Sequence, residues 1–112
     1  MKIAFSAKGK DMSSIIDARF GRASGFLIYD TESREFSVVD NIFINSGQGA
    51  GIKSAETIIK AGVEVLITGD CGPKALSALR MANVRAYSVK EVSIAEALKA
   101  FEDGKLLEIK PE

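Results

Sequence analysis

The chain has 112 residues, of which 46% are hydrophobic, and this is enough for one domain with a buried core. Fifteen basic and fifteen acidic residues give a formal net charge of zero, which disfavours nucleic acid or an anionic membrane as a partner. One cysteine and no histidine exclude an internal disulfide, a serine–histidine pair and a four-ligand Cys/His metal site. Because there is no long apolar stretch and no signal-peptide pattern, we expect a cytoplasmic protein.

The first half of the chain predicts three strands and a helix. The short apolar run at residues 2–7 precedes a polar loop and is typical of a buried strand. Residues 25–30 and 35–40 flank the turn sequence TESR and predict a β-hairpin. After a glycine-rich stretch, apolar residues recur at helical spacing as far as Gly62, which marks the end of a helix.

The second half alternates strands and helices. Residues 63–68 form a continuous apolar run that predicts a buried strand, and a helix then begins at Pro73. Residues 84–89 predict the last main strand. Residues 93–104 predict a helix that starts with a capping box and ends at a glycine, and the tail after it could add a short edge segment.

These elements predict one α/β domain over residues 1–112. Helix-linked strands must run parallel and hairpin strands antiparallel, so we expect a five-stranded mixed sheet with flanking helices, in the order 3-2-1-4-5 with strand 2 antiparallel. The loops at about 8–24, 41–51 and 69–73 then leave the same edge of the sheet. Open α/β sheets bind ligands at this edge, which makes it the predicted site.

The cysteine lies at the start of the second predicted helix, in the sequence GDCGPK. Asp70 can cap exposed amides there, and the positive end of a helix favours a thiolate at Cys71. Such a thiolate could ligate a soft metal or an iron–sulfur cluster. The alternative is that Cys71 is a small buried residue that fills the turn before Gly72 and Pro73.

The loop after the first strand carries the sequence ARFGRA. Arg19 and Arg22 flank Phe20 and Gly21, so the loop can offer two guanidinium groups and an aromatic face to an anion. Phe20 could equally belong to the core, with both arginines solvated.

The glycine-rich sequence GQGAGIKS resembles a phosphate-binding loop that ends at Lys53. Ile52 stands where that motif requires glycine, so a phosphate cradle is not specified. The stretch from Gly47 through Gly49 to Gly51 is instead interpreted as a flexible crossover or as a backbone lip that a bulky ligand can approach closely. The first strand carries no carboxylate, which argues against two-metal nuclease chemistry.

The sequences FGRA, NSGQGAGIKSAE and GDCGPKALSAL occur in this order across most of the chain. With them, the chain resembles the dinitrogenase iron-molybdenum cofactor biosynthesis family. The resemblance implies a ribonuclease H-like fold without nuclease activity. It also implies a non-enzymatic carrier, scaffold or chaperone for iron–sulfur or iron–molybdenum cofactor precursors. Phe20, Gly21, Arg22 and residues 47–51 match the family pattern, whereas Arg19 takes the place of a histidine.

The sequence thus predicts a cluster as cargo, held by Cys71 or by electrostatic capture. The predicted partners are the proteins that donate and accept the cluster, and the chain is expected to be a monomer or a weak homodimer. The alternatives are a regulatory domain that binds a small anion without metal and, less favoured, a nucleotide-dependent enzyme that uses Lys53. The candidate cofactor-binding residues are Arg19, Phe20, Gly21, Arg22, Gly47, Gly49, Gly51, Asp70 and Gly72, with Cys71 as the metal ligand.

Overall fold

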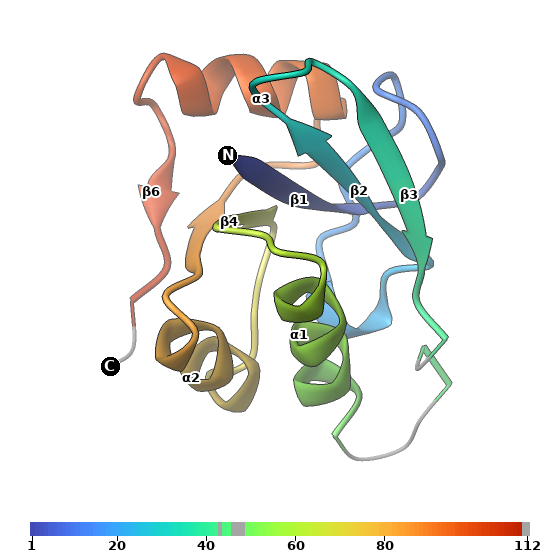
Figure 1. Cartoon of the computed structure of the whole chain (residues 1–112), viewed down its shortest axis with the longest axis vertical. Helices are drawn as coiled ribbons and strands as arrows, with labels where there is room; N and C mark the ends of the chain where they lie inside the picture. Colours follow the sequence, from blue (N-terminus) through green and yellow to red (C-terminus); the bar gives the residue numbers. More distant parts are fainter. Residues whose placement is uncertain (43, 46–48, 111–112) are drawn as a thin grey trace.

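The computed structural model describes residues 1–42, 44–45 and 49–110, which form a six-stranded sheet and three α-helices (Figure 1). The strands are β1 (Lys2–Ala7), β2 (Gly25–Asp30), β3 (Phe36–Asp40), β4 (Val65–Thr68), β5 (Arg85–Ser88) and β6 (Leu107–Glu108). The helices are α1 (Ala50–Lys60), α2 (Pro73–Met81), α3 (Ile94–Glu102) and the 3-10 turn η1 (Phe20–Arg22). Across these described ranges, no helix is both long and apolar enough to span a bilayer.

The strand order is β3-β2-β1-β4-β5-β6. Strand β2 runs antiparallel to β1 and β3, while β1, β4 and β5 are mutually parallel, so the predicted order and directions are confirmed. The predicted count of five strands is one too low. The tail supplies β6, which pairs antiparallel with β5 through Glu108 and Leu107. Two residues are too few to carry a strand periodicity that could be recognised in the sequence.

The sheet separates two layers of helices. Figure 1 shows α1 and α2 on one face and α3 on the other. In the central strands, Ala4 and Leu66 pack into the cluster with α1 and α2, whereas Phe5 and Ile67 pack into the cluster with α3. Because both faces of β1 and β4 are covered, their sequences are apolar throughout rather than alternating.

The predicted helix ends are confirmed by backbone geometry. Ser93 caps α3 by accepting a 3.1 Å hydrogen bond from the amide of Glu96, and the Glu96 side chain completes the capping box. Gly62 and Asn83 follow α1 and α2 with left-handed φ values of 81° and 61°.

Candidate functional site

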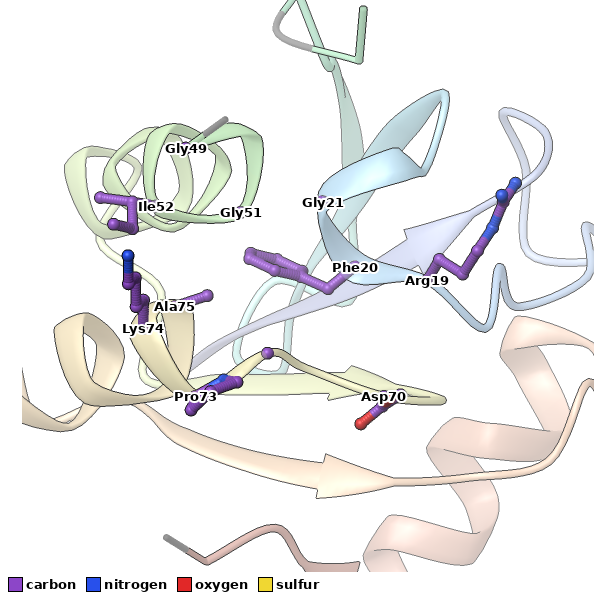
Figure 2. A pocket seen from close by; sticks show the side chains of 11 residues that line it. Arg19, Phe20, Gly21, Gly49, Gly51, Ile52, Asp70, Pro73, Lys74 and Ala75 are labelled. Carbon is purple, nitrogen blue, oxygen red and sulfur yellow. The ribbon is translucent and has the colours of Figure 1, made fainter. Parts of the chain in front are cut away.

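A pocket of about 410 Å³ opens at the carboxyl ends of β1 and β4 (Figure 2). Three segments enclose it: the loop after β1, the first turn of α1 and the first turn of α2. Most of the candidate residues from the sequence therefore lie together at the predicted edge. The lining residues are Arg19, Phe20, Gly21, Gly49, Gly51, Ile52, Asp70, Gly72, Pro73, Lys74 and Ala75.

The loop after β1 is held directly on the loop after β4. The amide of Asp70 donates a 2.8 Å hydrogen bond to the carbonyl of Ala18, and the amide of Phe20 donates a 3.3 Å bond to the carbonyl of Asp70. A Cβ atom on Gly69 would lie 2.6 Å from the Cα atom of Ala18, so the two backbones touch. This contact fixes η1 as one wall of the pocket.

Phe20 belongs both to the pocket wall and to the core. Its side chain is almost fully buried, and its ring centroid lies 5.3 Å from that of Phe26. The interpretation of Phe20 as a core residue is therefore confirmed, and the ring anchors the η1 turn that carries Gly21.

Sequence reasoning missed Asn41, which ties η1 to α1 although it is not part of the pocket lining. Its side-chain amide donates to the carbonyls of Ala23 at 2.9 Å and Gly21 at 3.3 Å, and its oxygen accepts from the Ser54 hydroxyl at 3.3 Å. Both Asn41 and Ser54 are buried. A lone asparagine after an edge strand ordinarily predicts a turn, so no separate sequence signal pointed to this bridge.

Two helix N-termini without side-chain caps line the pocket. The N-cap residues of α1 and α2 are Gly49 and Gly72, neither of which can offer a side-chain oxygen, and neither helix has an acidic residue in its first turn. The first amides of a helix have no partner within the helix, and its N-terminal end is electropositive. The pocket therefore combines two positive helix ends, whereas α3, with its capping box, is not part of the lining.

Lys74 is a site residue that sequence reasoning missed. It is exposed on the first turn of α2 and projects toward Ile52 of α1 (Figure 2). A lysine at a helix N-terminus opposes the helix dipole, and this unfavourable position was the available signal for a functional role. The lysine adds a positive charge beside the pocket.

The other charged groups of the lining are Arg19 and Asp70. The Arg19 side chain is 74% exposed and extends away from the pocket centre in Figure 2, with its Nε atom 4.0 Å from a carboxylate oxygen of Asp17. Asp70 accepts a 2.8 Å hydrogen bond from the amide of Cys71. Lys74 is therefore the lining cation that faces the pocket, the guanidinium group of Arg19 is directed away from it, and Asp70 supplies one carboxylate.

Cys71 is buried rather than exposed. Its side chain is 7% exposed, packs in the cluster with α1 and α2, and is not part of the pocket lining. Burial, with a further contribution from the charge of Asp70, raises the pKa of the thiol to about 12. The expected thiolate is therefore not favoured here, because desolvation outweighs the helix end. The alternative, a small residue that fills the turn, fits this environment, and ligation of a metal by Cys71 stays a prediction.

The remaining candidates lie outside the pocket lining. Arg22 is exposed and donates a 2.8 Å hydrogen bond to the carbonyl of Ile44. Lys53 lies on α1 but does not line the pocket, so this cavity lacks the lysine of a phosphate-binding loop. Gly47 lies outside the described residues. Within the described part of the chain, no three Cys, Asp or Glu side chains gather as a metal site would require.

The fold and the pocket define a small α/β protein with an electropositive, glycine-lined site at the carboxyl edge of its sheet. The sequence profile of the family described as dinitrogenase iron-molybdenum cofactor matches residues 1–104. The chain therefore belongs to this family, and the resemblance that its motifs indicated is confirmed.

Solved structures and a curated relative resemble the chain over nearly its whole length. The apo form of the orange protein from Desulfovibrio gigas has a TM-score of 0.94 and 35% identity, covering 98% of this chain and 93% of that one. An NMR structure from Thermotoga, provisionally described as a NifB protein, has a TM-score of 0.85 and 39% identity, with coverages of 96% and 91%. An uncharacterised protein of Methanocaldococcus jannaschii is 33% identical over 109 residues, which are 95% of this chain and 89% of the relative.

Proposed function

We propose that this protein is a non-enzymatic carrier that holds a preformed, anionic metal–sulfur cluster in the pocket between η1, α1 and α2. The cargo is an iron–sulfur or iron–molybdenum cofactor precursor, and the partners are the proteins that donate and accept it. The family is named for the iron–molybdenum cofactor of dinitrogenase. The orange protein is described in an apo form, which implies that it also has a form with a bound group. Both descriptions support a binding role.

The observation that carries the proposal is the pair of helix N-termini without side-chain caps. The first turns of α1 and α2 both line one cavity, neither Gly49 nor Gly72 caps them with a side chain, and Lys74 adds a positive charge beside them. Helix N-termini of this kind bind anions because the amides donate hydrogen bonds and the helix dipole favours negative charge. A volume of about 410 Å³ lies in the ordinary range for a small-molecule site.

The side chains favour electrostatic capture over direct metal ligation. The chain has no histidine, and the thiol of Cys71 is buried with its pKa raised to about 12. A single thiol would also supply only one of the sulfur ligands that a cluster needs. The pocket instead fits a cluster that brings its own sulfide or thiol ligands and is bound through its negative charge.

The chemistry of the lining is suited to binding rather than to turnover. Asp70 is the carboxylate that the lining offers, and its side chain already accepts a hydrogen bond from the amide of Cys71. A general acid–base mechanism needs a proton-transfer group whose pKa lies near the working pH, and imidazole, which most often supplies it, is absent from this chain.

Anaerobic reconstitution tests the proposal. The purified chain is incubated with iron and sulfide, with and without molybdate, and is then desalted and analysed for metal, labile sulfide and visible absorption. We expect a coloured protein with a constant ratio of metal to chain, and release of the cargo as salt is raised. Failure to retain metal above an unrelated protein of the same size under all these conditions would refute the carrier role.

A regulatory domain that binds a small anion without metal is the second candidate, because the same two helix ends would also attract phosphate or sulfate. In that case the colourless protein would show a rise in Tm with millimolar phosphate, and reconstitution would add no metal. If metal is retained and phosphate competes with it, the cluster is the better assignment of the site.

A further inference from the structure

Asp70 places a negative charge in a pocket that otherwise attracts anions. It is exposed and lines the pocket together with Lys74 and the first turns of α1 and α2, which have no side-chain caps. Figure 2 shows Asp70 on the segment that leads from β4 to Pro73. A carboxylate repels a nearby anion, so it weakens electrostatic capture. Capture by charge alone therefore leaves this residue unexplained.

Hydrogen bonds hold Asp70 in place before any ligand arrives. Its amide donates a 2.8 Å bond to the carbonyl of Ala18, and its carbonyl accepts a 3.3 Å bond from the amide of Phe20. One oxygen of its carboxylate accepts a 2.8 Å bond from the amide of Cys71. Carboxylates that bind metals are commonly oriented by hydrogen bonds of this kind.

The second carboxylate oxygen of Asp70 is available to a ligand. In the part of the chain that the structure describes, this oxygen has no hydrogen bond, and neither Arg19 nor Lys74 forms an ion pair with it. The guanidinium group of Arg19 lies beside Asp17 instead, with its Nε atom 4.0 Å from that carboxylate. An ionised carboxylate oxygen without a partner is a hydrogen-bond acceptor and a metal ligand.

The other described side chains around the pocket do not supply a metal ligand. The thiol of Cys71 is buried outside the lining. The remaining lining side chains, apart from the glycines, are either cationic or apolar: Arg19, Lys74, Phe20, Ile52, Pro73 and Ala75. Asp70 is thus the described lining residue whose side chain can coordinate a metal atom of the cargo.

We propose that Asp70 ligates the cargo, and that the cargo is a cluster in which one metal atom has an exchangeable coordination position. This inference rests on the carrier role proposed above. Binding is a ligand exchange, in which the free Asp70 oxygen forms a bond to the metal and one water molecule or thiolate leaves that metal for the solvent. The oxidation state does not change, and the cluster keeps its own sulfide ligands.

A single carboxylate ligand suits a protein that must also release its cargo. Iron–sulfur clusters prefer thiolate ligands to carboxylates. An acceptor protein that offers a thiolate can therefore displace Asp70 from the metal.

Asp70→Asn separates ligation from repulsion, because the two roles predict opposite changes. Asparagine keeps an oxygen that accepts the hydrogen bond from the amide of Cys71, but it has no negative charge. If Asp70 ligates the cargo, retention of metal and sulfide after anaerobic reconstitution and desalting should fall roughly tenfold or more. If Asp70 only repels anions, retention should rise. A rise or no change would overturn the ligand role.

Sulfate provides a control that contains no metal. Since it cannot be ligated, sulfate should bind Asp70→Asn roughly fivefold more tightly than the parent, as measured by an NMR titration of backbone amide shifts. We therefore expect sulfate affinity and cargo retention to change in opposite directions. A fall in both would show that the substitution distorts the pocket, and would also overturn the ligand role.

Two further variants test whether the carboxylate itself is needed. Asp70→Glu restores a carboxylate and should retain at least about threefold more cargo than Asp70→Asn. Asp103→Asn removes the same charge at the end of α3, outside the pocket lining, and should match the parent within about twofold. Urea denaturation confirms that each variant is folded. Equal losses in Asp70→Asn and Asp103→Asn would reduce the effect to net charge and overturn the ligand role.

The parent chain distinguishes failure of this inference from failure of the carrier role. A parent that retains no metal would refute the carrier role and the ligand role with it. Equal retention by the parent and by Asp70→Asn would leave the carrier role intact and remove only Asp70 as a ligand.

Discussion

Gly21 and Gly51 meet backbone to backbone at the pocket. A Cβ atom placed on Gly21 would lie 2.9 Å from the Cα atom of Gly51, closer than two such atoms can approach. A Cβ atom on Gly51 points elsewhere and would meet only the side chain of Ala75, at 3.4 Å. The two glycines are therefore not equivalent, because one sets the distance between η1 and α1 and the other leaves space between α1 and α2.

We expect opposite effects from alanine at these two glycines. Gly21→Ala should lower the free energy of unfolding by about 1–3 kcal/mol, since η1 must move away from α1. Gly51→Ala should be neutral or should stabilise by up to about 1 kcal/mol, because alanine is the better helix former and its methyl group fits. Urea denaturation of both variants measures the difference. Equal losses would show that the backbone contact does not control the separation of the two elements.

Two isoleucines that differ in burial allow a second comparison of stability. Ile67 is fully buried on β4, so Ile67→Ala should cost about 2–5 kcal/mol in the free energy of unfolding. Ile42 is 79% exposed, and Ile42→Ala should change stability by less than about 0.5 kcal/mol. Thermal or urea unfolding of the pair checks this. A loss below about 1 kcal/mol at Ile67 would contradict its position in the central strand.

The fold could be predicted because its signals are local and mutually consistent. The buried strands are apolar throughout, and Pro73, Ser93 and Gly62 mark helix ends by mechanisms that act within one turn. The hairpin then fixes one antiparallel neighbour, and the helical crossovers fix the parallel ones. The two-residue strand β6 was not included in the predicted number of strands, because its pairing with β5 is a tertiary contact and leaves no pattern in the sequence.

The sequence predicted that the three loops lie together, but it did not predict the directions of the side chains around the pocket. The three loops converge as the topology requires, yet the sequence could not show that the side chain of Cys71 turns into the core while the side chain of Lys74 faces the pocket. Cys71 precedes the N-cap Gly72, where the backbone is extended, whereas Lys74 lies in the first helical turn, so helical periodicity does not relate the directions of the two side chains. Which of the two reaches a ligand therefore depends on the packing of α2 against α1.

Two lysines that lie near helix N-termini allow a matched test of the cargo site. Lys74 lines the pocket, whereas Lys53 on α1 does not. If the cargo is an anionic cluster in this pocket, Lys74→Gln should weaken its retention roughly fivefold, as expected for the loss of one partly exposed charge pair. Lys53→Gln should retain cargo within about twofold of the parent.

Metal and sulfide analysis after reconstitution and desalting compares these variants. Higher salt should reduce retention by the parent more than by Lys74→Gln, since the variant has already lost one of the interactions that salt screens. Equal effects of the two lysine substitutions would indicate a general effect of net charge, and would remove the pocket as the site of binding.

Because the pKa of the Cys71 thiol is raised in the folded chain, we expect the chain to become less stable in alkaline solution. This pKa is raised from an ordinary 9.0 to about 12 in the folded chain, so both states keep the proton below pH 9. Above that pH the unfolded chain releases the proton first, and the free energy of unfolding falls by at most about 1.4 kcal/mol per pH unit. Urea denaturation from pH 8 to pH 10.5 measures this loss. Cys71→Ala should remove this contribution, and identical pH slopes for the parent and the variant would contradict the raised pKa.

The same substitution separates electrostatic capture from direct ligation by sulfur. Cys71 lies in the core outside the pocket lining, so a cluster held by the helix ends and Lys74 does not need its thiol. We therefore expect Cys71→Ala to retain cargo within about twofold of the parent, with a loss of stability that urea denaturation records separately. Alanine is the suitable replacement because serine would bury a hydroxyl group in an apolar cluster. Reconstitution is compared at a temperature where both proteins are fully folded, and Lys74→Gln serves as the positive control for weakened binding. A tenfold or greater loss of cargo in folded Cys71→Ala would show that the thiol ligates the metal, which is one of the two roles that the sequence leaves open for Cys71.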